Sequence, residues 1–310
     1  MQTRQRFLHG FAAVLMALSW RIGLAGTPPA IPVQAPAAQA AQKAEAVALP
    51  NREGSLKFAV LGDFGTGDKV QYETADQMAK VHERFPYELV ITVGDNLYGS
   101  QRPQDFKLKF EDPYKALLDA KVKFYASLGN HDDVREQTLY KLFNMDGKRY
   151  YSFKAPKQNV RFFALESSYL DKPQIAWVEK ELQASGEDWK IPYFHHPLYS
   201  SGERHGSSLP QRDALEPLFV DNGVSVVFAG HDHFYERINP QKGIVYFVVG
   251  SGGQLRKGNI DARSTMTASG FDTDRAFMVA EIIGDEMYFN AISRTGTVVD
   301  SGIIRRRKQE

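Results

Sequence analysis

Two histidines stand one residue apart in GHDH, residues 230–233, directly after the apolar run VSVVFA. Imidazole nitrogens are common ligands of transition metals. A single His-x-His pair is weak support for a metal site, because the chain has eight histidines and several can be structural. The interpretation of this pair therefore depends on whether other segments supply further ligands.

Four other apolar runs also end in polar side chains. LKFAVLGDFG contains Asp63, YELVITVGDNLY contains Asp95 and Tyr98, VKFYASLGNHDD contains Asn130 and His131, and WKIPYFHHP contains His195 and His196. Each of these residues alone has an ordinary interpretation: a turn aspartate, a packed tyrosine or an asparagine that caps a turn. Their recurrence at the ends of apolar runs, with His231 and His233, favours a metal site.

The ligand types indicate which metals would bind. Carboxylate, phenol, amide and imidazole groups suit iron, zinc or manganese. The chain contains no cysteine, so thiolate ligands, disulfides and iron–sulfur clusters are excluded. The ligands are too many for one tetrahedral site, and they suit two metals that share a carboxylate.

Secondary structure explains how distant segments could meet. The five apolar runs have the length and composition of buried strands. Helical patterns at residues 72–85 and 176–185 lie between some of them. This alternation predicts an α/β layered fold with much of the sheet parallel, in which ligands gather at the carboxyl ends of the strands.

The later part of the chain predicts further strands. Residues 243–253 and 278–302 are expected to be strands joined by short turns that complete a second layer. The glycine-rich stretch GSGGQLRKG lacks the Lys-Ser/Thr ending of a phosphate-binding loop, so it predicts a flexible turn.

Length and composition indicate one folded domain. Of the 310 residues, 43% are hydrophobic, and 38 Lys and Arg balance 37 Asp and Glu. This balance gives no reason to expect a nucleic-acid partner. Residues 1–26 resemble a signal peptide, with an uncleaved membrane anchor as the alternative. Residues 27–55 form an Ala/Pro-rich linker, and residues 56–310 are the predicted catalytic domain.

The motifs GDFG, GDNLY, GNHD, PYFHHP and GHDHFYER, in this order, resemble the calcineurin-like metallophosphoesterases. The tyrosine of GDNLY makes the chain most similar to the small, tartrate-resistant type of purple acid phosphatase. The resemblance covers roughly residues 56–303. It implies an α/β fold arranged as a four-layer α/β/β/α sandwich, with the metal site at the carboxyl ends of the strands.

The resemblance also implies a binuclear metal centre. Ferric iron would be bound by Asp63, Asp95, Tyr98 and His233. A divalent zinc, iron or manganese ion would be bound by Asp95, Asn130, His195 and His231, so that Asp95 bridges the two metals. The family motif selects His195 rather than His196 as the ligand.

Two further histidines receive catalytic roles from the resemblance. His131 would point toward the phosphate, and His205 would contact the substrate and protonate the leaving group. Asp132 and Asp232 are expected to fix the loops around the site rather than to bind metal.

The implied function is the hydrolysis of phosphate monoesters by a metal-activated hydroxide, as in an acid phosphatase. A phosphodiesterase or nucleotide hydrolase on the same centre is the alternative, and a non-catalytic metal-binding protein is a third hypothesis. The expected partners are small phosphoesters. We expect a monomer that is exported to the periplasm or secreted, with no stable membrane insertion after signal removal.

Overall fold

The computed structural model describes residues 46–187 and 189–308. The predicted signal peptide and residues 27–45 of the predicted linker lie outside this part of the chain. Within the described residues, no helix is both long enough and apolar enough to cross a membrane.

The first of two sheets contains six strands in the order β13-β12-β11-β1-β2-β3. Strands β1, β2 and β3 are parallel, and β11 pairs antiparallel with β1. The bounds are β1 Leu56–Leu61, β2 Leu89–Val93, β3 Lys123–Ser127, β11 Ala276–Ile283, β12 Glu286–Ser293 and β13 Val298–Arg305.

The second sheet contains seven strands in the order β10-β8-β9-β7-β6-β5-β4. Its central strands β5, β6, β7 and β9 are parallel, and antiparallel strands lie at both edges. The bounds are β4 Tyr151–Lys154, β5 Val160–Ala164, β6 Trp189–Tyr193, β7 Val226–Ala229, β8 Tyr235–Ile238, β9 Val245–Val249 and β10 Thr267–Phe271.

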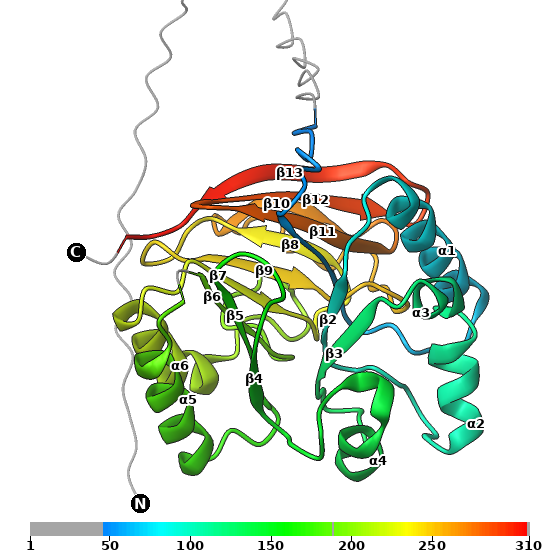
Figure 1. The fold of residues 1–310 in the computed structure, drawn as a ribbon, viewed down its shortest axis with the longest axis horizontal. Coiled ribbons are helices and arrows are strands. Elements are labelled where there is room, and N and C mark those ends of the chain that lie inside the picture. The colour runs from blue at the N-terminus through cyan, green and yellow to red at the C-terminus, as the bar shows by residue number, and fades with distance from the viewer. Residues whose placement is uncertain (1–45, 188, 309–310) are drawn as a thin grey trace, which may run out of the picture. The chain divides into compact units, whose positions relative to one another are not determined.

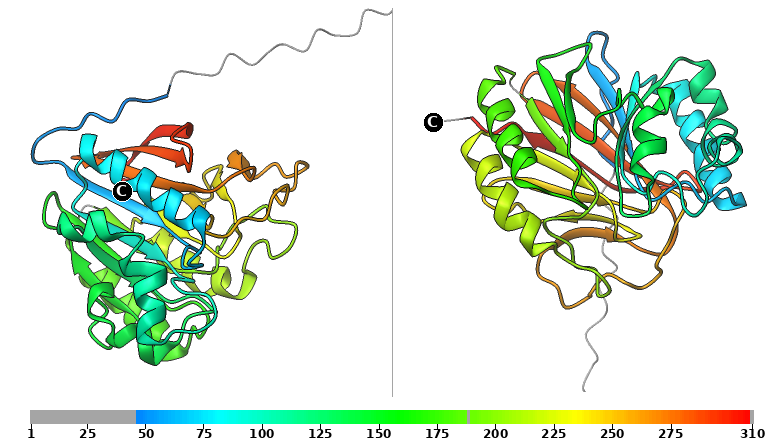
Figure 2. Two further views of the ribbon diagram at one scale, coloured as in Figure 1. Left: turned by 90° about the vertical axis from the view of Figure 1, so that its right-hand side faces the viewer. Right: turned by 90° about the horizontal axis from the view of Figure 1, so that it is seen from below.

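Helices cover the outer faces of both sheets, so the predicted four-layer α/β/β/α arrangement is confirmed (Figures 1 and 2). Helices α1–α3 lie beside the first sheet, and α5 and α6 lie beside the second. The α-helical bounds are α1 Lys69–Arg84, α2 Pro103–Phe106, α3 Lys115–Asp119, α4 Val134–Leu139, α5 Lys172–Ala184 and α6 Leu209–Asp221.

The two helices that the sequence predicted begin at aspartate N-caps. The Asp68 side chain accepts a hydrogen bond from the Gln71 N–H at the start of α1, and Asp171 does the same for Gln174 in α5. Such caps satisfy backbone donors that the first helical turn leaves unpaired. Each helix then buries an apolar stripe, which in α5 includes Val178 and Leu182.

Aromatic contacts join the inner faces of the two sheets. The Phe58 ring lies edge-on to Phe162, with centroids 5.3 Å apart, and to Phe228 at 6.1 Å. Phe58 belongs to the first sheet and the other two rings to the second, so these contacts fill the layer between the sheets. The carboxyl ends of the inner parallel strands thus reach a common edge of the sandwich.

The prediction for the late strands was wrong in one respect. Strand β9 does belong to the second sheet, but β11, β12 and β13 extend the first sheet beyond β1. Two of the five predicted ligand strands, β6 and β7, themselves lie in the second sheet. The apolar pattern identified the strands but did not specify which sheet each one joins, because inner strands of both sheets are buried on two faces.

Some residues just before Leu56 bond to the first sheet. The backbone N–H groups of Asn51 and Arg52 donate to the buried Glu281 carboxylate at 2.6 and 2.7 Å. The Val47 N–H donates to the Ser301 hydroxyl at 2.9 Å. The last residues of the predicted linker are therefore attached to β11 and β13.

Candidate metal centre

Three side chains form what we call the first ligand group: Asp63, Tyr98 and His233. The Tyr98 hydroxyl lies 3.1 Å from Asp63 Oδ1 and 3.2 Å from His233 Nε2. His233 Nε2 lies 3.4 Å from Asp63 Oδ1. Asp63 and Tyr98 follow strands of the first sheet, whereas His233 follows β7 of the second.

The second ligand group consists of Asn130, His195 and His231. His195 Nε2 lies 3.1 Å from Asn130 Oδ1 and 3.1 Å from His231 Nδ1. Asn130 follows β3 of the first sheet, and the two histidines follow β6 and β7 of the second. Each group therefore takes ligands from both sheets.

Asp95 joins the two groups. Its Oδ1 lies 3.4 Å from His195 Nε2 in the second group. Burial raises the Asp95 pKa, and the Tyr98 side chain in the first group lies close enough to the carboxylate to lower it. Ligand atoms of Asp63, Asp95 and His195 all lie within 4.8 Å of one another. This carboxylate therefore occupies the position that a bridging ligand requires.

The separations between ligand atoms fit metal coordination. For metal–ligand bonds of about 2.0–2.2 Å, neighbouring ligand atoms are separated by roughly 2.8–3.6 Å in tetrahedral or octahedral geometry. The distances of 3.1–3.4 Å within both groups fall in this interval. The residues present therefore fit two cations.

The orientation of His195 supports the same conclusion. Its Nδ1 lies 2.9 Å from the Val93 carbonyl oxygen, which can only accept a hydrogen bond. Nδ1 therefore carries the proton, and Nε2 presents a lone pair to the Asn130 carbonyl oxygen. A hydrogen bond from the second ring nitrogen to a backbone carbonyl is typical of metal-binding histidines. His195 Nε2 and Asn130 Oδ1 are both acceptors and repel each other, and a cation bound between them would remove this repulsion.

Three candidate ligands have unusual backbone conformations. Asp63, Asp95 and His231 have φ values of 54°, 49° and 71°, in the left-handed region that side chains other than glycine adopt at a cost. Hydrogen bonds between the loops hold them there: the His231 N–H donates to Asp63 Oδ2 and the His131 N–H to Asp95 Oδ1, each at 3.0 Å. Such strain is common at functional sites.

Close approach explains the glycines that precede Asp95 and Asn130. Gly94 has a φ of 86°, and a Cβ atom there would lie 2.7 Å from His195 Nδ1. A Cβ atom on Gly129 would collide with the carboxylate of Asp95. These positions have no room for a side chain because the ligands from neighbouring strands occupy it.

Asp132 fixes the loops of the first sheet, as the sequence predicted. Its carboxylate accepts hydrogen bonds from the N–H groups of Asn96 and Leu97 at 3.1 Å and of Gly129 at 2.8 Å. Burial, and then the charge of Asp95, raises the pKa of Asp132 to about 7. One side chain thus ties the segment that bears Tyr98 to the segment that bears Asn130.

Asp232 has the corresponding role for the loop of residues 199–208. Its Oδ2 accepts hydrogen bonds from the Ser200 hydroxyl at 2.5 Å and from the Gly206 N–H at 3.2 Å. This loop carries His205, whose ring centroid lies 4.3 Å from that of His231. The structure therefore places His205 directly beside the second ligand group.

His131 and His196 also lie at the centre. His131 Nε2 lies 4.0 Å from Asp95 Oδ2, and the His131 side chain is 53% exposed, so it can meet a molecule that arrives from solvent. His196 Nδ1 lies 3.0 Å from the Ser167 hydroxyl, and its ring packs against His231 at 4.4 Å. His195, rather than His196, therefore belongs to the second ligand group.

Residues 250–258 form part of the centre, which the sequence pattern did not predict. The N–H groups of Gly252 and Gly253 donate to the carbonyl oxygens of Gly62 and Asp63 at 2.9 and 3.1 Å. These bonds place Arg256 next to the first ligand group, where its N–H donates to the His233 carbonyl at 2.9 Å. The segment is thus an anchored part of the centre, and the prediction of a flexible turn missed it.

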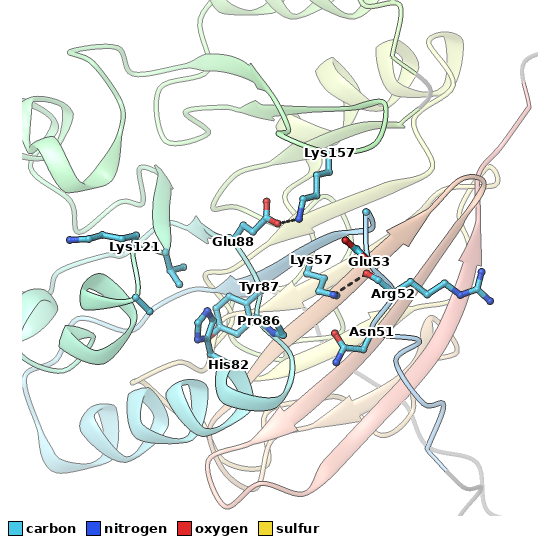
Figure 3. A pocket seen from close by; sticks show the side chains of 13 residues that line it. Asn51, Arg52, Glu53, Lys57, His82, Pro86, Tyr87, Glu88, Lys121 and Lys157 are labelled. Atoms are coloured by element: carbon cyan, nitrogen blue, oxygen red, sulfur yellow. Dashed lines mark hydrogen bonds and ion pairs between the residues drawn. The ribbon is translucent and has the colours of Figure 1, made fainter.

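The centre lies away from the pocket drawn in Figure 3. That pocket is lined by Lys57, Glu88 and Val122, which lie at the amino ends of β1, β2 and β3. The candidate ligands follow the carboxyl ends of the same strands. No candidate ligand is among the residues that line this pocket.

Burial sets the protonation of the centre. Burial, and then the Asp95 carboxylate, raises the pKa of Asp63 well above its usual range. Burial, followed by Asp63 and Asp95, also raises the pKa of Tyr98. Burial lowers the pKa of His231 to about 2 and that of His233 to about 4. At neutral pH the imidazoles of His231 and His233 are neutral and can bind metal, whereas burial disfavours the charged forms of Asp63 and Tyr98.

Binding of Fe(III) should therefore displace protons, because ligands bind in their deprotonated forms. Tyr98→Phe should release about one proton fewer per chain than the parent protein, since phenylalanine has no hydroxyl proton. Loading metal-free protein from a weak iron chelate at pH 7, with the chelate alone as blank, measures this release. The exposed Tyr169→Phe is the matched control, and equal release by parent and Tyr98→Phe would contradict a Tyr98 ligand.

Sequence comparisons identify relatives of this chain. The family model of calcineurin-like phosphoesterases matches residues 56–235, which include all the candidate ligands. Human tartrate-resistant acid phosphatase type 5 is 29% identical over 238 residues, or 64% of this chain and 73% of the relative. Purple acid phosphatase 17 of Arabidopsis thaliana is 29% identical over 246 residues, or 67% and 72%.

Solved structures share the fold. GAP50, described as the anchor in the inner membrane complex of Plasmodium, has a TM-score of 0.74 at 21% identity and covers 83% of this chain and 90% of its own. A purple acid phosphatase from yellow lupin seeds has a TM-score of 0.69 at 20% identity and covers 83% and 55%. Because the family model matches more than half of the sequence, the chain belongs to the calcineurin-like phosphoesterase family, in which it resembles the purple acid phosphatases.

Proposed function

We propose that this protein is an acid phosphatase that hydrolyses small phosphate monoesters at a binuclear metal centre. The observation that carries the proposal is the placement of Asp95 between two sets of ligand atoms, each with the spacing of a metal site. Relatives named acid phosphatases support the same reaction class. The fold alone does not, because it also occurs in a protein described as an anchor.

The proposed metals follow from ligand chemistry. Asp63, Asp95, Tyr98 and His233 would hold ferric iron, since a phenolate and two carboxylates are hard anionic ligands. Asp95, Asn130, His195 and His231 would hold a divalent zinc, iron or manganese ion, since an amide and two imidazoles bring no further charge. When bound, the two cations supply positive charge for phosphate and lower the pKa of a water molecule.

The remaining polar side chains would act on the substrate. His131 is exposed beside Asp95, where it can donate a hydrogen bond to a phosphate oxygen. His205 lies beside His231 on the loop that Asp232 holds, where a protonated imidazole can transfer its proton to the departing alkoxide oxygen. In this reaction the oxygen of a water molecule forms a new bond to phosphorus, and the bond between phosphorus and the ester oxygen breaks.

Replacement of Asp95 tests the shared ligand. Asp95→Ala should reduce the metal content from two ions per chain to fewer than one and lower kcat/KM for an aryl phosphate by about a thousandfold or more. Elemental analysis and steady-state kinetics measure both, and the exposed Asp119→Ala is the control. A variant that retained two metals and near-normal turnover would refute the shared centre. Parallel assays of the aryl phosphate and its bis-ester separate the monoesterase from the diesterase alternative.

The role of His205 predicts a dependence on the leaving group. His205→Asn should lower kcat/KM about a hundredfold for an alkyl phosphate, whose alkoxide needs a proton, and much less for a nitrophenyl phosphate. His82→Asn, at the far end of the sheet, is the control. Equal losses on both substrates would assign His205 to binding or structure instead of proton transfer.

We also propose that the protein is exported, with residues 1–26 removed as a signal peptide. The basic start, the short apolar run and the small residues that follow support this proposal. Amino-terminal sequencing of protein recovered from the periplasm or medium should find residues 1–26 missing. Recovery of the uncleaved chain in the membrane fraction would favour the anchored alternative.

A further inference from the structure

Two arginines lie beside the candidate metal centre and have no part in the function proposed above. Arg256 is in the loop after β9, and its backbone N–H binds the His233 carbonyl at 2.9 Å. Arg204 precedes His205 on the loop of residues 199–208. The two loops are hydrogen-bonded, since the Glu203 N–H donates to the Asn259 carbonyl at 2.9 Å. Both arginines therefore belong to one side of the centre.

Neither guanidinium forms an ion pair with any carboxylate in the described part of the chain. By contrast, Arg263, which is close to Arg256 in the sequence, binds Asp261 at 2.8 Å. The Nη1 atom of Arg256 is buried and has no hydrogen-bond partner in the described structure. An unpaired buried donor is costly, so this nitrogen is suited to a ligand that supplies an oxygen.

Charged groups of the candidate metal centre act on Arg256. Burial, and then the charge of Arg204, lowers its pKa, whereas Asp232, Tyr98 and Asp63 raise it. The guanidinium therefore lies within the electrostatic reach of the first ligand group. If cations occupy the centre, they neutralise the charges of Asp63 and Tyr98. The two arginines are then left with excess positive charge next to the bound phosphate.

We propose that Arg204 and Arg256 form a second anion subsite, which binds the phosphate group attached to the scissile one in a phosphoanhydride such as pyrophosphate or a nucleoside diphosphate. This inference rests on the proposed phosphatase function and specifies its substrate class. Guanidinium groups bind phosphate through paired, charge-assisted hydrogen bonds. A simple monoester brings no second anion, so it would leave the two arginines unpaired.

The subsite lies on the side from which the leaving group departs, because it adjoins His205. In phosphoanhydride hydrolysis, water oxygen forms a bond to the scissile phosphorus, and the bond from that phosphorus to the bridging oxygen breaks. The bridging oxygen leaves with the electron pair as part of the second phosphate, and one water proton goes to solvent or to that phosphate. The arginines remain protonated throughout and stabilise the charge that develops on the leaving phosphate.

The test compares metal-loaded parent protein with Arg256→Met and Arg204→Met. Each variant should lower the ratio of kcat/KM for pyrophosphate to kcat/KM for phenyl phosphate by about tenfold to a hundredfold. Calorimetric binding of methylenediphosphonate should weaken by a similar factor, while binding of methylphosphonate changes much less. Arg256→Lys keeps the charge but not the planar donor pair, so it should reduce the kcat/KM ratio by an intermediate factor.

Lys257→Met is the matched control, because Lys257 is the exposed neighbour of Arg256 and carries the same charge. Arg204 is exposed, so its variant gives a result even if Arg256→Met does not fold. Unchanged ratios in both arginine variants, or a change equal to that of Lys257→Met, would overturn the subsite. Failure of the parent protein to hydrolyse phenyl phosphate would instead overturn the proposed function, and calorimetry would still report whether the diphosphonate binds through the arginines.

Discussion

The buried carboxylate of Asp95 is the interaction on which the site depends. It is 1% exposed and touches Tyr98 on one side and His195 on the other. An ionised carboxylate in such surroundings is unfavourable unless positive charge accompanies it. The nearby imidazoles do not provide that charge, because burial lowers the pKa of His195, His231 and His233. Bound cations would satisfy the carboxylate and the imidazole lone pairs together.

The loops around Asp95 are organised to keep this arrangement in place. Positive φ values at Asp63, Asp95 and His231 turn the chain sharply after three strands, and hydrogen bonds from neighbouring loops hold each turn. Asp132 and Asp232 then fix longer segments on either side. The cost of the strained backbone is met by contacts among the loops themselves, so the ligand positions are set by the protein before any cation arrives.

The sequence predicted the strands and the polar residues that lie together at their ends, because buried strands and the polar residues after them form local patterns. The division of the strands between sheets could not be predicted in this way, as β11 to β13 demonstrate. The position of Arg256 was also missed. It depends on hydrogen bonds from Gly252 and Gly253 to a loop nearly two hundred positions earlier in the chain, and no local pattern encodes those bonds. Choosing His195 over His196 required the family motif, and the geometry gives the physical reason through the Val93 carbonyl.

Both ligand groups take members from each of the two sheets, and this has a mechanical consequence. Any cation held there would be a further cross-link between the two sheets, added to the hydrogen bonds between their loops and to the aromatic packing further inside. Removal of the ions would remove that cross-link and leave the hydrogen bonds between the loops in place. The centre would thus couple the heat resistance of the whole domain to the supply of metal in its surroundings.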